Sequence, residues 1–255
     1  MNTNYDKWAG IYDSIYYGFK QDISFYVKES VKINGQVLEI GCGTGRITFS
    51  LAANPTINVT GIDISPQMIK TVDEKAKQKY PNLETHVMDM RNITINKKYD
   101  RVIIPFNGFQ AMLNVNDQIS CLHSIKNVLK NDSKLILDMF IPNIEMFDQE
   151  NNRYYHASSI QSKNISIWHK SNFNSIEQTI NTTIKMSEYS CNGKTSHYYN
   201  EYQLRYTYMQ EAAYLFERCG YKITSLYGDF NKSKFDNNSD KMVWILKPSG
   251  DNKND

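Results

Sequence analysis

The sequence is poor in cysteine and has no long hydrophobic run. Its 255 residues include four Cys, none of them in a C-x-x-C pair. This usage argues against a zinc site and a disulfide scaffold and is typical of a reducing compartment. No apolar run approaches the roughly 20 residues that span a bilayer, and the polar start MNTNYDKWAG does not resemble a signal peptide. We therefore expect a cytoplasmic protein that does not bind a membrane.

A large excess of charge is also missing. The formal net charge is +2 at pH 7, which does not indicate the basic surface of a nucleic-acid-binding protein. Hydrophobic residues make up 40% and charged residues 22%, and these near-globular values exclude a wholly disordered chain. Tyrosine is abundant instead, with 18 residues. Its apolar ring and polar hydroxyl suit a mixed binding pocket.

Short apolar segments alternate with amphipathic ones along the first 140 residues. The patterns predict strands at 36–40, 57–62, 83–87, 99–104 and 134–140, and helices at 5–16, 22–32, from about 44, from 65 and at 117–130. Five successive strand–helix units predict a parallel sheet with right-handed crossovers and helices on both faces. A helix at 209–219 and strands at 221–227 and 241–247 complete a seven-stranded, mostly parallel α/β fold.

The helical pattern is absent between about residues 153 and 208. Alternating runs at 165–169, 176–189 and 198–208 predict three antiparallel strands inserted after the fifth strand, with a hairpin turn at 191–194. We therefore divide the chain into three parts. A helical lid covers 1–34, a core combines 35–145 with 205–248, and a β insertion at 150–204 shapes the substrate site.

A glycine-rich loop, LEIGCGTGR at 38–46, joins the first strand to the next helix. Its G-x-G-x-G spacing differs from the G-x-G-x-x-G of dinucleotide-binding folds. It favours a smaller anionic group, such as an amino-acid carboxylate, at the helix N-terminus. Asp63 follows the second strand, where a carboxylate can accept both hydroxyls of a ribose. Asp89 follows the third strand, where an adenine amino group would need an acceptor.

These segments resemble class I S-adenosylmethionine-dependent methyltransferases. Residues 37–52, 59–65 and 86–93 are similar to their first three motifs, and residues 99–113 to their fourth strand and its loop. The chain looks closest to small bacterial enzymes that methylate amines or hydroxyls of small molecules, including amino-sugar N,N-dimethyltransferases. The resemblance implies a Rossmann-like fold and S-adenosyl-L-methionine as the cofactor. It does not extend to 150–204.

The resemblance also implies roles for individual residues. Three glycines would surround the methionine part, Asp63 would hold the ribose, Asp89 would accept from the adenine amino group, and Phe106 would lie under the sulfonium. The cofactor-binding residues expected are Tyr12, Glu39, Gly41, Gly43, Gly45, Asp63, Ile64, Met68, Asp89, Met90 and Phe106. Related enzymes often carry a His near position 111, where this chain has Ala111.

The acceptor site is expected to combine the N-terminal segment, the loop after the fourth strand and the insertion. Its expected residues are Tyr16, Tyr17, Asn107, Phe109, Trp168 and His169. A hydroxyl acceptor needs a base, whereas an amine needs only to arrive neutral; Tyr17 and His169 are the catalytic candidates. Further possible bases are His156, His197 and Glu201, while His123 is expected to be structural. No His-plus-carboxylate cluster has metal-ligand spacing, so no metal is predicted.

Other functions remain open at this point. An RNA methyltransferase would need a basic face and aromatic platforms, and a non-enzymatic S-adenosylmethionine-binding protein would fit a damaged glycine loop, which is not seen. A membrane-lipid methyltransferase would need a basic amphipathic helix, whereas the first helix carries Asp6 and Asp13. We expect methyl transfer to a nitrogen or oxygen of a small-molecule acceptor by a monomer or homodimer without a nucleic-acid partner, with Gly18 as the hinge of the lid.

Overall fold

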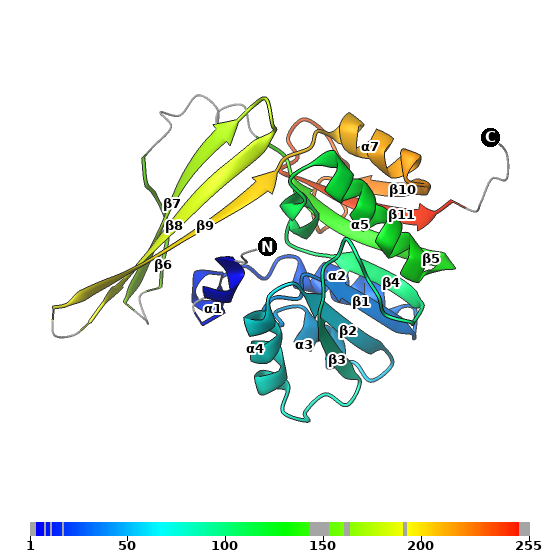
Figure 1. Ribbon diagram of the computed structural model, residues 1–255, viewed down its shortest axis with the longest axis horizontal. Helices are drawn as coiled ribbons and strands as arrows, with labels where there is room; N and C mark the ends of the chain where they lie inside the picture. Colours follow the sequence, from blue (N-terminus) through cyan, green and yellow to red (C-terminus); the bar gives the residue numbers. More distant parts are fainter. Residues whose placement is uncertain are drawn as a thin grey trace.

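The computed structural model describes residues 4–7, 9–10, 12–16, 18–142, 153–160, 164–190 and 193–249, which form two β-sheets and flanking helices (Figure 1). Seven strands form one sheet in the order β10-β11-β5-β4-β1-β2-β3. They are β1 (Gln36–Ile40), β2 (Asn58–Asp63), β3 (Leu83–Val87), β4 (Tyr99–Ile104), β5 (Leu129–Phe140), β10 (Tyr221–Tyr227) and β11 (Lys241–Pro248). Strands β1 to β5 are parallel, and β11 pairs antiparallel with both β5 and β10.

Alternation along the central strands buries both faces of this sheet. Leu38 and Val102 belong to one apolar cluster, which includes buried residues of α5 and α7, whereas Val37 and Ile103 belong to a second cluster with α2 and α3. The helices are α2 (Ile23–Val31), α3 (Thr48–Ala52), α4 (Pro66–Ala76), α5 (Val115–Val128) and α7 (Met209–Arg218). The predicted seven-stranded, mostly parallel sheet with helices on both faces is therefore confirmed.

The order of the strands reverses between β1 and β4. From β1 the chain proceeds through β2 to β3, and then returns to place β4 on the other side of β1. Ligands of open α/β sheets bind at such a switch point, in the crevice outside the carboxyl ends of the strands. The glycine loop follows β1 and residues 105–107 follow β4, so both segments lie at this crevice.

The predicted antiparallel insertion after β5 is present as a second sheet, in the order β6-β7-β8-β9. Its strands are β6 (Tyr155–Ile160), β7 (Ile165–Asn174), β8 (Thr179–Tyr189) and β9 (Thr195–Arg205). We expected three strands, and β6 is the additional one. It is almost wholly exposed, and a register shift between His156 and Ser158 interrupts its alternation, so it carries little hydrophobic pattern. Residues 191 and 192 of the predicted hairpin turn lie outside the described residues.

The second sheet extends away from the first, and the N-terminal segment lies in the angle between them (Figure 1). We define the inner face of the second sheet as the one carrying Ile165 and Ile167 of β7 and Ile184 and Met186 of β8. These residues share an apolar cluster with Ile15 of the N-terminal segment, and Tyr5, Tyr12, Tyr16 and Tyr202 pack against it. The opposite side is called the outer face.

Two helix predictions, and the expected run of five strand–helix units, differ from the structure. The helix expected at 5–16 is instead a 3-10 turn, η1 (Asn4–Lys7), and a short helix, α1 (Tyr12–Ile15), with Gly10 in a turn between them. Glycine weakens a helix interior, which accounts for this break. Helix α3 begins at Thr48 rather than near 44, because the glycine loop extends further. Residues 88–98, all of them described, contain no helix between β3 and β4.

Candidate functional site

Three glycines give the loop after β1 a conformation that side chains disfavour. The φ angles of Gly41, Gly43 and Gly45 are +71°, +55° and +92°, in the left-handed region that glycine adopts freely. The amides of Gly41 and Cys42 both donate to the carbonyl oxygen of Ile62, at 2.8 and 3.0 Å. The loop is thereby fixed to the end of β2. A Cβ atom at Gly45 would also collide with the Phe49 ring.

Asp63, the last residue of β2, joins the glycine loop to helix α4. Its Oδ2 accepts from the Gly43 amide at 2.9 Å, and its Oδ1 accepts from the Ser65 amide at 2.9 Å. Burial raises the pKa of this carboxyl, while the hydrogen bonds from Ser65 and Gly43 oppose the rise. An ionised carboxylate has about four acceptor positions, so two such bonds leave capacity for further donors. Asp63 is therefore oriented at the crevice.

Asp89, which follows β3, forms an ion pair with Arg91, a residue that the sequence analysis did not single out. Its carboxylate accepts from the Arg91 guanidinium, at 2.6 Å for Nη2 to Oδ2, and Arg91 also reaches Asp117 of α5 at 3.0 Å. These side-chain bonds from Arg91 are the main cause that lowers the pKa of Asp89. Both carboxylate oxygens of Asp89 therefore already have donors.

Three apolar residues among those expected to bind the cofactor differ in exposure. Ile64 and Met90 are half-buried, and Met90 packs on the cluster beneath α5. Met68 is buried in the cluster that joins α4 to the inner face of the second sheet. Ile64 and Met90 therefore keep some exposed surface that a ligand could contact, whereas Met68 does not.

Glu39 is a buried carboxyl at the base of the crevice. Its Oε2 accepts from the Thr48 hydroxyl at 2.6 Å. Burial raises the pKa of Glu39 to about 8, against the opposing effect of that hydrogen bond. The side chain lines a small cavity of about 30 Å³, together with the glycine loop, Tyr12 and Phe106.

The N-terminal segment is fastened over the glycine loop by its carboxylates. Asp13 accepts from the Thr44 hydroxyl and from Lys75 Nζ, each at 2.5 Å. Asp6 accepts from the hydroxyl of Ser65, the N-cap of α4, at 2.5 Å. No feature of the sequence pointed to these contacts, because the partners lie at least 31 positions apart.

Tyr12 borders two hollows. A Cβ placed on Gly43 would lie 3.9 Å from the Tyr12 ring, so the ring covers the glycine loop. Tyr12 lines both a cavity of about 30 Å³ and a hollow of about 350 Å³. Thr44 and Arg46 also line both of them. The larger hollow is also lined by Asp13, Tyr16, Phe19, Lys20, Ile23, Gly45, Phe49 and Lys75.

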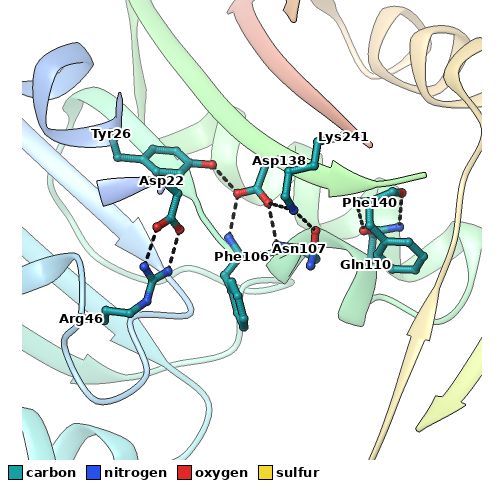
Figure 2. Close-up of polar contacts among 9 residues, drawn as sticks. All are labelled: Asp22, Tyr26, Arg46, Phe106, Asn107, Gln110, Asp138, Phe140 and Lys241. Atoms are coloured by element: carbon teal, nitrogen blue, oxygen red, sulfur yellow. Dashed lines mark hydrogen bonds and ion pairs between the residues drawn. The ribbon is translucent and has the colours of Figure 1, made fainter. Parts of the chain in front are cut away.

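Arg46 connects the glycine loop to the aromatic residues of the crevice. Its guanidinium binds both carboxylate oxygens of the fully buried Asp22, at 2.5 and 2.6 Å (Figure 2). It also lies 5.3 Å from the ring centroids of both Phe19 and Phe106. The Phe106 ring lies 4.9 Å from those of Tyr16 and Phe19. Phe106 therefore lies at the crevice beside Arg46 and Phe19, two residues that the sequence did not single out, and its place under the sulfonium stays a prediction.

The acceptor residues expected from the sequence do not all face the crevice. Phe109 is fully buried in the cluster beneath α5, where it packs on Phe216, so it is a core residue and the expectation of an acceptor contact is wrong. Asn107 lies beside Phe106 in the loop after β4. Tyr16 is hydrogen-bonded to Tyr202 of the second sheet. Tyr17 lies outside the described residues.

Trp168 and His169 point to opposite sides of the second sheet, because neighbouring residues of a strand alternate. His169 pairs with Ile184 and therefore shares the inner face. Trp168 pairs with His156 and packs edge-on against its ring at 5.0 Å, on the outer face. The expectation that Trp168 lines the acceptor site beside His169 is therefore wrong.

The same geometry separates the possible bases. His197 pairs with Ser187 and Glu201 with Thr183, which places both on the outer face with His156. His123 is exposed on α5, rather than packed in the core as its apolar neighbours suggested. His169 alone among these five faces inward, and burial lowers the pKa of its imidazole. Burial therefore favours the neutral form of His169.

No group of three or more His, Cys, Asp or Glu residues in the described part of the chain is arranged to hold a metal ion. No helix there is long and apolar enough to cross a membrane.

Known proteins resemble this chain in sequence and in fold. Residues 37–132 match the family model described as a methyltransferase domain. A Bacillus subtilis protein named "Putative methyltransferase YqeM" is 24% identical over 96% of this chain and 97% of its own. An S-adenosylmethionine-dependent methyltransferase from Clostridium acetobutylicum has a TM-score of 0.80 at 17% identity, covering 96% of this chain and 99% of its own.

A further solved structure, described as the S-adenosylmethionine-bound amino pentose methyltransferase CalS10 from Micromonospora echinaspora, has a TM-score of 0.71 at 14% identity. The match covers 94% of this chain and 97% of that one. The domain match and the shared fold agree with the glycine loop and with Asp63 at the switch point. Residues 37–132 therefore match a methyltransferase domain, and the described part of the chain has the fold of class I S-adenosylmethionine-dependent methyltransferases.

Proposed function

We propose that this enzyme methylates a nitrogen or an oxygen atom of a small-molecule acceptor in a pocket closed by the N-terminal segment. The observation that carries the proposal is the hollow of about 350 Å³ beside Tyr12. Its volume is in the range of small-molecule sites, about 300–1,000 Å³, and its walls combine aromatic rings with charged groups. The amino pentose methyltransferase named above has the same fold, which supports a polar small acceptor.

The residues at the switch point fit the chemistry of the cofactor. We assign the methionine part to Gly41, Gly43 and Gly45, whose backbone conformation permits close approach of a ligand. We assign the ribose hydroxyls to Asp63, which keeps acceptor capacity beyond its two amide bonds. Asp89, oriented by Arg91, would accept from the adenine amino group. When bound, S-adenosylmethionine supplies an electrophilic methyl group on a positively charged sulfur.

The small cavity beside Glu39 can hold the cofactor only if the N-terminal segment moves. A cavity of about 30 Å³ corresponds to one water molecule and is far too small for a nucleoside. Tyr12 covers the glycine loop, and the contacts of Asp13 and Asp6 hold the segment in that position. We infer that these contacts open for loading and re-form afterwards. The closed segment then excludes water from the reacting atoms.

The chain contributes to methyl transfer mainly by alignment. Fixing two reactants in a productive geometry supplies about 7–11 kcal/mol of the barrier. Aromatic faces contribute to binding of the charged cofactor, because a ring near a cation stabilises it by about 0.5–2 kcal/mol. Phe106 and Tyr16, whose rings lie 4.9 Å apart, are the rings we assign to the sulfonium side. An amine acceptor needs no base if it arrives neutral. For a hydroxyl acceptor the candidate base is His169, which faces inward from the second sheet and lines neither of the two hollows.

Release of S-adenosylhomocysteine tests the proposal. The purified enzyme is incubated with S-adenosylmethionine and panels of amino sugars, amino acids and phenols, with total RNA as a separate arm. We expect turnover in a small-molecule arm. Turnover with RNA alone would overturn the acceptor class.

The neighbours Trp168 and His169 then provide a matched pair of variants. His169→Ala changes the inner face and should lower turnover or raise the KM of the acceptor, whereas Trp168→Ala changes the outer face and should do neither. Equal effects of the two substitutions would argue against a contact between the acceptor and the inner face of the second sheet.

A further inference from the structure

Two consecutive non-glycine residues adopt a strained backbone beside the crevice. Phe106 and Asn107, which follow β4, have φ angles of +56° and +59°. Asparagine tolerates the left-handed region, but a bulky aromatic residue there is an outlier. Such strain persists only where the surrounding structure over-determines it, and it concentrates at functional sites. What holds this turn is therefore of functional interest.

The turn is held by one buried carboxylate, Asp138 of β5 (Figure 2). Asp138 Oδ1 accepts from the Phe106 amide at 2.7 Å, and Oδ2 accepts from the Asn107 amide at 3.2 Å. Both strained residues thus donate to the same side chain. Asp138 is fully buried, whereas the two turn residues that donate to it are half-buried.

Two other side chains hold Asp138 itself in position. The Tyr26 hydroxyl of α2 donates to Oδ1 at 2.6 Å, and Lys241 Nζ of β11 approaches Oδ2 at 3.5 Å and Asn107 Oδ1 at 3.4 Å. Four donors therefore converge on two oxygens. A carboxyl group can accept at both oxygens, whereas an amide in its place presents one oxygen and one NH₂ group. A buried polar group of this kind requires such hydrogen bonds.

The turn in turn sets the position of the Phe106 ring. This ring contacts Arg46, Tyr16 and Phe19 and lines the same small cavity as Gly41 and Gly43. A change in the φ angle of Phe106 would swing the ring away from these contacts. The position of an aromatic wall of the crevice thus depends on a carboxylate that does not line it.

We propose that Asp138 is a positioning residue for methyl transfer, which acts by holding the Phe106–Asn107 turn so that the Phe106 ring faces the sulfonium of the cofactor. The proposal rests on the placement of Phe106 given under the proposed function. Nothing in the sequence pattern indicates this role, since Asp138 lies 32 positions after Phe106 and 112 after Tyr26.

The test compares a charged cofactor with an uncharged one. Dissociation constants of S-adenosylmethionine and S-adenosylhomocysteine are measured by calorimetry for the wild type, Asp138→Asn and Tyr26→Phe. Asp138→Asn leaves a turn amide facing an NH₂ group, and it should weaken S-adenosylmethionine about threefold or more relative to S-adenosylhomocysteine, as expected for a lost cation–π contact. Tyr26→Phe removes a bond to the same carboxylate but spares the turn. It should lower the melting temperature and leave the ratio unchanged.

A double-mutant cycle separates positioning from a direct effect of charge. Phe106→Leu removes the ring and should shift the ratio in the same direction. If Asp138 acts through Phe106, then Asp138→Asn has little further effect on the ratio in the Phe106→Leu background. If the loss of negative charge acts directly on the sulfonium, the two effects multiply, and that result would overturn the proposal. An unchanged ratio in folded Asp138→Asn would overturn it as well.

Asn107→Gly provides a background in which the turn is less strained, because glycine adopts left-handed angles freely. If Asp138→Asn alone does not fold, the double variant Asn107→Gly/Asp138→Asn is compared with the single variant Asn107→Gly. The ratio of the two cofactor dissociation constants is then expected to change as above, and an unchanged ratio would again overturn the proposal. Failure of the wild type to bind either cofactor would instead refute the proposed function, so the two failures are distinguishable.

Discussion

The Glu39 carboxyl should make stability fall as the pH rises. Burial raises its pKa from 4.5 to about 8 in the folded protein, so between these values the folded state holds a proton that the unfolded chain releases. The free energy of unfolding therefore decreases across this window, by a few kcal/mol at about 1.4 kcal/mol per pKa unit. Glu39→Gln, which is permanently neutral, should remove most of this decrease. Thermal melting between pH 5 and 9 measures it.

Glu84→Gln is the matched control. Glu84 lies on β3, where its side-chain bond from Lys97 is the main cause that lowers the pKa. Its contribution to stability is present above the unfolded pKa and lost at low pH, the reverse of Glu39. Glu84→Gln should therefore give no gain at pH 8 to 9. If the melting temperatures of the wild type and Glu39→Gln change with pH in the same way, Glu39 is ionised in the folded state.

The positions of individual crevice residues could be predicted where those residues belong to a local sequence motif. Gly41, Gly43, Gly45 and Asp63 were identified from their spacing and from the ends of two neighbouring strands, and the structure places them together at the switch point. Asp138 could not be found in this way, because its partners come from α2, the loop after β4, and β11. Contacts between distant segments have no signature in one sequence.

At the scale of elements, the N-terminal segment is the part whose removal is most informative. Without residues 1–18, Tyr12 and Asp13 no longer cover or fasten to the glycine loop. The truncated protein should fold, because both clusters that pack the seven-stranded sheet are built from later residues. It should bind S-adenosylhomocysteine more weakly and lose nearly all turnover. Calorimetry and the release assay measure the two effects. Full turnover by the folded truncated protein would refute the role of a lid.

The strands were predicted more accurately than the helices. β1, β3, β4 and β10 have the expected bounds because apolar runs between turn residues define buried strands. The predicted helix at 5–16 failed, since the apolar spacing of Tyr5 and Tyr12 also suits two short turns that pack on the second sheet. In this segment tertiary contacts outweigh the local pattern, and no periodicity reveals that.

At the scale of the whole molecule, the second sheet should be separable from the first. Both clusters that pack the seven-stranded sheet are drawn from residues outside 153–205. Replacing residues 150–204 with a short Gly-Ser linker should therefore leave a cooperative melting transition and some binding of S-adenosylhomocysteine. Turnover should vanish, because the inner face and Tyr202 no longer pack on the N-terminal segment. Circular dichroism during heating measures the transition, and a non-cooperative melt would show that the chain is one folding unit.

The central claim is that S-adenosylmethionine binds at the switch point between β1 and β4 with its ribose on Asp63. Titration calorimetry with S-adenosylhomocysteine, on the wild type and on Asp63→Ala, tests it most directly. Charge-assisted hydrogen bonds of this kind contribute about 1.5–3 kcal/mol, so Asp63→Ala should weaken binding about ten- to a hundredfold while the protein remains folded. Absence of wild-type binding at millimolar concentration, or equal affinities of the two proteins, would contradict the account.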